Sequence, residues 1–194
     1  VNNTSDNCAG VNLDFEPFDS GTSVATTNGI VDFIAKLRAA LNADKELSIY
    51  LSPTYYSRFS ILISGAIDDL DYINYSCYPW SGSWSTTAIA VAPQSSYVTQ
   101  VNKYMDAGCP PEKMVLTLPS YGVSFDTVTA GYGASVINHN GSYGYCAAKF
   151  NTTLSATLRT RQYRSGAESP WFSYYNGTDY TTIMYDDEIS LAVK

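Results

Sequence analysis

The sequence contains no uninterrupted apolar run of the roughly 18 residues that a membrane-spanning helix needs. We therefore expect no membrane partner. Positive charge is also scarce, because 11 Lys and Arg residues stand against 18 Asp and Glu, for a formal net charge of -7. Nucleic-acid phosphates would be repelled by this balance, so we expect a neutral ligand and no nucleic-acid partner.

Metal-binding and nucleophile signatures are missing as well. The single histidine, His139, lies in the polar stretch INHNGS without a nearby Ser or Cys signature, which favours a surface residue over a Ser–His–Asp triad. Asp186 and Asp187 lack a third residue at metal-ligand spacing, and we interpret them as structural. The four cysteines match no zinc motif, and three disulfide pairings are open to them. We expect no metal and no other cofactor.

Asn-x-Ser/Thr triplets are abundant, by contrast. Together with an even number of cysteines, they favour a secreted or extracellular glycoprotein with disulfides, with a vacuole or lysosome as the alternative location. The chain begins at Val1 without Met or a leader, which predicts a processed or partial protein. The six acceptor positions are Asn2, Asn3, Asn74, Asn140, Asn151 and Asn176.

Strand and helix patterns alternate along the first two thirds of the chain. This alternation predicts an α/β fold with parallel strands joined by right-handed crossover helices. Residues 123–194 are rich in Gly, Tyr, Ser and Thr and predict an inserted segment that is irregular or β-rich, with room for a helix near 147–160. The expected strands cover residues 8–15, 46–53, 71–80 and 113–122, and the expected helices cover 30–41, 57–67 and 95–107, the first with an N-cap at Thr26, Thr27 or Asn28.

The first strand, GVNLDFEP, presents an unusual polar face. Because side chains alternate along a strand, Asn12, Asp14 and Glu16 share one face. Burying carboxylates without partners costs several kcal/mol or a large pKa shift. The pattern therefore indicates either chemistry at this face or an edge strand whose polar face is wet.

The same strand resembles the fourth-strand signature of glycoside hydrolase family 18, the chitinase family, whose usual form is Asp-x-x-Asp-x-Asp-x-Glu. Glu16 and Asp14 match its last two carboxylates, whereas Asn12 and Ala9 stand at the two earlier Asp positions. Three further segments resemble family motifs in the same order along the chain. They are LDYINYSCYPW, with Tyr78 on the functional Tyr and with Ser76 and Pro79 departing from the pattern; KMVLTLPSYG, with Thr117 at a common Gly position; and YDDEISLAVK.

The resemblance implies a (β/α)8 TIM barrel, of which this chain supplies about strands four to seven. Residues 1–122 would form the barrel half with the catalytic strand, and 123–194 an insertion-like segment before an absent last strand. We expect the missing strands from the rest of the parent chain. An open barrel half cannot close its hydrogen-bond ladder, so the isolated chain should have poor stability and little or no activity.

The resemblance also implies a retaining, substrate-assisted hydrolysis of β-1,4-linked N-acetylglucosamine glycans such as chitin. Glu16 would protonate the glycosidic oxygen, Asp14 would accept the acetamide N–H, and Tyr78 would donate to the acetamide oxygen. Asn12 can donate an N–H to Asp14 but cannot share a proton with it.

Aromatic residues near the expected strand ends are candidates for contact with sugar rings. These are Trp80, Trp84 and Tyr121, with packing as the alternative for each Trp; Tyr55 and Trp171 are weaker candidates. The alternative function is a catalytically weak or inactive chitinase-like lectin that binds N-acetylglucosamine glycans, and a third is a relative with no ligand.

Overall fold

The computed structural model describes residues 8–14, 23–52, 56–145 and 160–194, which fall into two compact units. The first comprises residues 1–76 and 99–117, and the second comprises 77–98 and 118–194. The division falls within one helix, between Val98 and Thr99, and the domain boundary predicted at residue 122 stays a prediction. Within the described ranges, no helix has both the length and the apolar character to cross a membrane.

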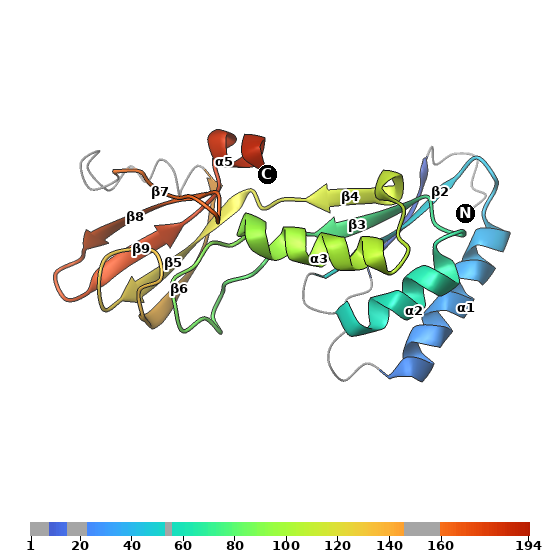
Figure 1. Ribbon diagram of the computed structural model, residues 1–194, viewed down its shortest axis with the longest axis horizontal. Helices are drawn as coiled ribbons and strands as arrows, with labels where there is room; N and C mark the ends of the chain where they lie inside the picture. The colour runs from blue at the N-terminus through green and yellow to red at the C-terminus, as the bar shows by residue number, and fades with distance from the viewer. Residues whose placement is uncertain (1–7, 15–22, 53–55, 146–159) are drawn as a thin grey trace. The chain divides into compact units, whose positions relative to one another are not determined.

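The first unit contains a four-stranded parallel sheet whose strands follow one another in chain order (Figure 1). Helices connect successive strands, which confirms the predicted α/β architecture. The strands are β1 (Gly10–Asp14), β2 (Glu46–Leu51), β3 (Tyr72–Ser76) and β4 (Met114–Thr117); the helices are α1 (Val24–Ala40), α2 (Tyr56–Ala66) and α3 (Gln94–Asp106), with a 3-10 turn at Pro111–Lys113.

Helix α1 begins earlier than the sequence pattern predicts. Its N-cap is Ser23, whose hydroxyl accepts a hydrogen bond from the backbone N–H of Thr26 at 3.0 Å. Ser23 satisfies one of the donors that every helix leaves unpaired at its start, and the three predicted cap positions are therefore helical instead. Farther along, a Cβ at Gly65 of α2 would lie 2.9 Å from a methyl carbon of Val31, so glycine permits α1 and α2 to pack closely.

The core of the first unit follows the alternation of β2. Leu47, Ile49 and Leu51 are fully buried, whereas the intervening Ser48 and Tyr50 are half-buried on the opposite face. Aromatic rings complete this core: the Tyr104 ring of α3 lies 5.0 Å from that of Phe59 and 4.8 Å from that of Tyr75. The sheet therefore has one apolar face and one face that carries polar side chains.

The segment predicted as a single strand over 113–122 is two strands in different sheets. β4 ends at Thr117, and a second strand, β5 (Tyr121–Thr127), starts after a short break. Pro119 lies in that break, where its lack of a backbone N–H removes a donor that a continuous ladder would need. Tyr121 thus belongs to the second unit rather than to the parallel sheet.

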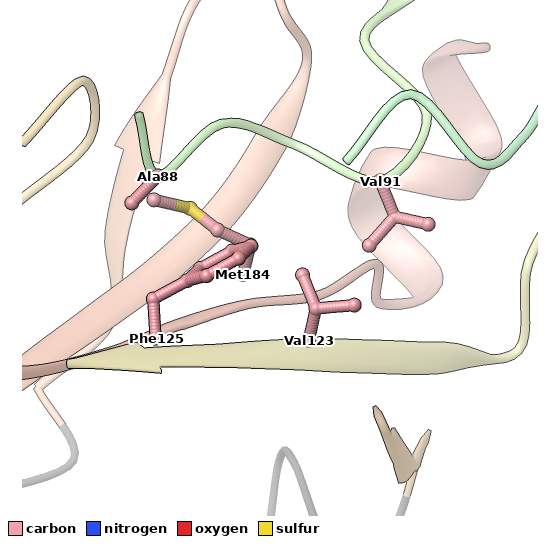
Figure 2. Packing of buried hydrophobic residues seen from close by; sticks show 5 residues of the cluster. All are labelled: Ala88, Val91, Val123, Phe125 and Met184. Atoms are coloured by element: carbon pink, nitrogen blue, oxygen red, sulfur yellow. The ribbon is translucent and has the colours of Figure 1, made fainter. Parts of the chain in front are cut away.

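The second unit is built on a five-stranded antiparallel sheet, so the β-rich form of the predicted insertion is the observed one. Its strand order is β6-β5-β9-β8-β7. Val123 and Phe125 of β5 and Met184 of the neighbouring strand β9 pack with Ala88 and Val91 in its core, as Figure 2 shows. The remaining elements are β6 (Val136–Gly144), β7 (Gln162–Arg164), β8 (Ser169–Tyr175), β9 (Tyr180–Met184) and α5 (Glu188–Val193).

Several sequence-based predictions differ from the structure or fall outside the residues that it describes. His139 is half-buried within β6, with its ring centroid 5.5 Å from that of Phe125, rather than in a surface loop. Cys8, Cys77 and Cys109 are thiols in this structure and form no disulfide with one another. The helix predicted near 147–160 and the fourth cysteine, Cys146, lie outside the described residues.

Candidate active site

A row of polar side chains crosses the first three strands of the parallel sheet. Asn12 of β1 is paired in register with Ser48 of β2, and the Ser48 hydroxyl donates to Asn12 Oδ1 at 2.8 Å. The side-chain amide of Asn74, on β3, donates to the same oxygen at 2.7 Å. Its Nδ2 atom also lies 3.3 Å from the Ser48 hydroxyl oxygen, so the three side chains form one connected network.

This network fixes the orientation of the Asn12 amide. Because Oδ1 accepts two hydrogen bonds, the carbonyl side of the amide faces β2 and β3, and the Nδ2 group faces away from both donors. The structure thus shows Asn12 as an acceptor. The predicted donation from Asn12 to Asp14 stays a prediction.

Asp14 is the last residue of β1 and its side chain is exposed. It is paired in register with Tyr50 of β2, two positions beyond the pair formed by Asn12 and Ser48. Because alternate residues of a strand share a face, Asn12 and Asp14 lie in sequence along one side of β1, toward its carboxyl end. The predicted acid, Glu16, lies outside the described residues, as does Tyr55.

The opposite side of β1 is apolar, as the alternation predicts. Leu13 lines a mostly apolar cavity of about 410 Å³ together with Ile49 of β2 and with Gly29, Ile30 and Phe33 of α1, and Asp14 also borders this cavity. The Phe33 side chain is 52% exposed, which is high for a phenylalanine beside a core. Within the described sheet β1 is an edge strand, and the apolar surface beside it is incompletely covered.

Tyr78 and Tyr121 lie together in the second unit. Their ring centroids are 5.7 Å apart with the rings at 80°, an edge-to-face contact, and both side chains pack against the core of Figure 2. Both residues are half-buried, so part of each ring remains accessible. The structure therefore brings these two predicted site residues together within one unit.

The candidate tryptophans occupy different environments. The indole N–H of Trp80 donates to the carbonyl of Cys77 at 3.0 Å, and its backbone N–H donates to Val91 at 2.7 Å, so Trp80 is held on both sides. Trp84 is 65% exposed, and a Cβ at Gly82 would lie 2.6 Å from its ring. Trp171 is half-buried and packs against the core of the second unit. Of the three, Trp84 offers the most open ring face.

The acidic pair before α5 is committed to contacts within the protein. Asp187 caps α5 by accepting from the backbone N–H of Ser190 at 3.0 Å, and Arg161 Nε donates to its carboxylate at 2.8 Å. Burial raises the pKa of Asp187, but the hydrogen bonds from Arg161 and Ser190 outweigh it and hold that pKa below its usual value. Asp187 thus has the geometry of a helix cap.

Asp186 is buried next to Asp187 and forms an ion pair with Lys194. Lys194 Nζ lies 2.5 Å from Asp186 Oδ1, and the Ser190 hydroxyl donates to the same oxygen at 2.8 Å. Burial raises the pKa of Asp186, and the Lys194 ammonium group opposes this shift. Among the described residues, no group of three or more His, Cys, Asp or Glu side chains could hold a metal ion.

Sequence reasoning did not identify Ser48 and Asn74 as partners of Asn12. Each is a polar residue that stands between two apolar residues of a strand, in the segments LSI and INY. This pattern is the sequence signal that could have identified them. A parallel register brings such residues side by side on one face. The pairing was not available from the sequence because a strand pattern does not specify its neighbours.

The chain matches the sequence profile described as Glycosyl hydrolases family 18 over residues 3–194. Among curated proteins it is similar to Endochitinase 1 of Metarhizium anisopliae, with 32% identity over 111 residues that cover 52% of this chain and 26% of that protein. It is also similar to Probable chitinase 2 of Drosophila melanogaster, with 34% identity over 32% of this chain and 14% of that protein. The chain thus spans about a quarter or less of the length of these two relatives.

Solved structures share the fold at low sequence identity. The Group IV chitinase of Ostrinia furnacalis has a TM-score of 0.80 at 20% identity, covering 95% of this chain and 57% of that one. The GH18 chitinase of Cycas revoluta in complex with (GlcNAc)3 has a TM-score of 0.77 at 20% identity, covering 95% and 58%. The chitinase-like agglutinin RobpsCRA of Robinia pseudoacacia has a TM-score of 0.74 at 20% identity, covering 95% and 57%.

These likenesses agree with the architecture of the first unit, in which parallel strands alternate with helices as part of a (β/α)8 barrel. The strand with Asn12 and Asp14 and the motif with Tyr78 both fall inside the matched range. The chain therefore belongs to family 18 of the glycosyl hydrolases.

Proposed function

We propose that the protein to which this chain belongs is a secreted hydrolase of β-1,4-linked N-acetylglucosamine glycans, such as chitin or chitooligosaccharides. Membership of family 18 over nearly the whole chain is the observation that carries this proposal. Two curated relatives named as chitinases and a neighbouring chitinase solved with (GlcNAc)3 support the substrate class.

The proposed mechanism is retaining and substrate-assisted. Glu16 protonates the glycosidic oxygen, and the substrate's acetamide oxygen attacks C1 to give an oxazolinium ion. Asp14 accepts the acetamide N–H and stabilises the positive charge that develops, while the Tyr78 hydroxyl donates to the acetamide oxygen. Glu16 then acts as base for the water that opens the ring. The exposed carboxylate of Asp14 at the carboxyl end of β1 is suitably situated for this role.

Substrate-ring contacts are assigned to aromatic residues of the second unit. Trp84 is the first candidate because its ring is exposed, and Trp80 and Tyr121 are the others. In this proposal Asn12 belongs to substrate binding indirectly, through the orientation of the Asp14 carboxylate.

The experiment is a turnover assay on chitooligosaccharides with the full-length parent protein and its Glu16→Gln variant. We expect the parent to cleave with retention of configuration, and the variant to lose turnover but still bind chitin beads. Cleavage by the variant at the parent's rate would remove Glu16 from the mechanism. An inactive parent would contradict the hydrolase proposal.

A lectin is the second candidate function, and the likeness to a chitinase-like agglutinin favours it. A lectin requires a binding cleft without a working acid, so it predicts an inactive parent protein that is retained on chitin beads. Loss of both activity and retention would leave a relative without a glycan ligand.

The remaining barrel strands are proposed to come from the rest of the parent chain. The curated relatives are longer than this chain, and the cavity beside β1 is lined mainly by apolar residues such as Leu13, Ile30 and Phe33. A β/α segment of the parent that paired with β1 would cover this cavity and bury the Phe33 ring. We expect the parent protein to be much more stable than residues 1–194 alone, as measured by thermal unfolding of both. Equal unfolding temperatures would contradict this.

A further inference from the structure

Three of the six Asn-x-Ser/Thr triplets lie in the described parts of the chain, and they differ sharply in their surroundings. Asn74 lies within β3 and is half-buried. Asn140 lies within β6, and Asn176 follows β8 in the turn that leads to β9; both are exposed. N-glycosylation requires an acceptor amide that can carry a bulky, hydrated group at the surface. The three sites can therefore be ranked by their contacts.

The Asn176 side chain stabilises the turn through its oxygen. Its Oδ1 accepts hydrogen bonds from the backbone N–H groups of Thr178 at 3.0 Å and Asp179 at 2.9 Å. These bonds make an Asx-type turn. Gly177, between Asn176 and Thr178, has a φ of +108°, which glycine adopts without steric cost. The acceptor oxygen is thus held by the backbone, independently of Nδ2.

The side-chain nitrogen of Asn176 has two N–H groups, and its hydrogen-bond contacts are long. Nδ2 lies 3.2 Å from the Thr181 hydroxyl and 3.5 Å from Asp126 Oδ1. An N-glycan replaces one of the two hydrogens and leaves the other for Thr181. The folded turn can therefore carry a glycan while the Asn176 oxygen keeps both of its backbone hydrogen bonds.

Asn74 presents the opposite situation. Its Nδ2 donates to Asn12 Oδ1 at 2.7 Å and lies 3.3 Å from the Ser48 hydroxyl. Both of these partners belong to other strands of the sheet. A sugar on this nitrogen would separate the side chains that connect β1, β2 and β3. The folded parallel sheet is incompatible with a glycan there.

Asn140 is exposed, but its side-chain nitrogen makes a shorter hydrogen bond than either contact of the Asn176 nitrogen. Its Nδ2 donates to Asp126 Oδ1 at 2.8 Å, and its Oδ1 accepts from the Asn138 side chain at 3.0 Å. It lies within the edge strand of the sheet rather than in a turn. Its amide nitrogen also approaches the same Asp126 oxygen as that of Asn176, so a glycan at one site crowds the other.

We propose that Asn176 is the N-glycan acceptor among these three triplets and that Asn74 remains unmodified. In the reaction, Asn176 Nδ2 forms a bond to C1 of an oligosaccharide carried on a lipid pyrophosphate, the co-reactant of the secretory pathway. The bond from C1 to the pyrophosphate oxygen breaks, the lipid pyrophosphate leaves, and the Nδ2 proton passes to a base of the transferase. This inference does not depend on the hydrolase activity.

The test is secretion of the full-length protein from a eukaryotic host, followed by enzymatic glycan release in ¹⁸O water and peptide mass spectrometry. Release of an amide-linked glycan converts Asn to Asp and introduces ¹⁸O, so each former acceptor is marked. We expect the mark at Asn176 and none at Asn74. A mark at Asn74, or at Asn140 with Asn176 unmarked, would overturn the proposal.

Two variants control for folding. Thr178→Ala removes the acceptor triplet while keeping the Asn176 side chain, and should abolish the mark. Thr178→Ser preserves the triplet at the same position and should retain it. Secretion of both variants in comparable yield shows that the loss in the first reflects the triplet and not misfolding. An Asn176 mark that survives Thr178→Ala would contradict the assignment.

Discussion

The Asn74 amide donates a hydrogen bond to the side-chain oxygen of Asn12 at 2.7 Å, which ties the third strand of the parallel sheet to the first. Ser48, on the strand between them, donates to the same oxygen. Asn12 stands at a position where the family signature usually has Asp. Two donors aimed at one oxygen suit a carboxylate equally well, so the network accommodates either residue.

Asn12→Asp should shift the pH dependence of activity in the parent protein. The new carboxylate keeps its two donors but adds a negative charge beside Asp14, and like charges raise the pKa of a neighbouring carboxyl group. We expect the acid limb of the rate profile on chitooligosaccharides to move to higher pH. Asn138→Asp, an equal charge change on β6, is the control and should leave the profile in place. An unchanged profile for Asn12→Asp would contradict the coupling.

Asn74→Ala should reduce kcat more than it raises KM. Removing one donor leaves the Asn12 amide less constrained, and through it the Asp14 carboxylate, while the sugar-contacting surfaces are untouched. Loss of the short hydrogen bond to Asn12, together with the longer one to Ser48, should also cost about 1 kcal/mol or more of unfolding free energy. Steady-state kinetics and urea unfolding measure the two effects.

The control for a purely structural effect is Asn74→Asp. This variant keeps an oxygen but not the donor, and should fail to restore kcat. Recovery of kcat by Asn74→Asp would show that the donor has no role in positioning.

Trp84→Ala and Trp171→Ala should have opposite phenotypes. Because the Trp84 ring is 65% exposed, its removal should change the unfolding free energy by less than about 0.5 kcal/mol but raise KM for chitooligosaccharides. Trp171 packs against the core of the second unit, so its removal should cost about 2 kcal/mol or more. Urea unfolding and KM measurements on both variants separate the two roles. Unchanged KM in Trp84→Ala would remove it from substrate binding.

The contribution of the ion pair between Arg161 and Asp187 to the free energy of unfolding should decrease at low pH. The folded-state pKa of Asp187 is lowered, so its stabilising effect is present above the ordinary carboxyl pKa and is lost as the pH falls through the folded-state value. We expect Arg161→Gln to be less stable than the wild type at pH 7, with a smaller difference at pH 3. Urea unfolding at both pH values measures this. A difference that stays constant with pH would contradict it.

The parallel part of the fold was predictable because its signals are local. In β2, apolar Leu47, Ile49 and Leu51 alternate with Ser48 and Tyr50, and this period of two identifies a strand with one buried face. The helix through Ile30 and Ile34 shows the corresponding helical period. Its start was misplaced because Ser23 lies outside that period, so only the cap geometry reveals it.

The second unit was less predictable because its order depends on long-range pairing. β5 pairs with both β6 and β9, and β9 follows β5 by more than 50 residues along the chain. Short strands rich in Ser, Thr, Tyr and Gly carry weak periodic signals, so the sequence indicated a β-rich segment without its strand order. The candidate residues Asn12, Asp14 and Tyr78 came from motif resemblance, whereas Ser48 and Asn74 emerged from the register of neighbouring strands.

Strand β6 borders the antiparallel sheet, and its pairing with β5 shifts register twice, between Ser124 and Phe125 and between Asp126 and Thr127. Gly141, with a φ of +111°, adds a further bend. Another chain can extend a sheet only by offering a straight strand to evenly spaced backbone groups, and these irregularities deny it that template. At the β6 edge, the sheet is therefore a poor template for edge-to-edge pairing with another chain.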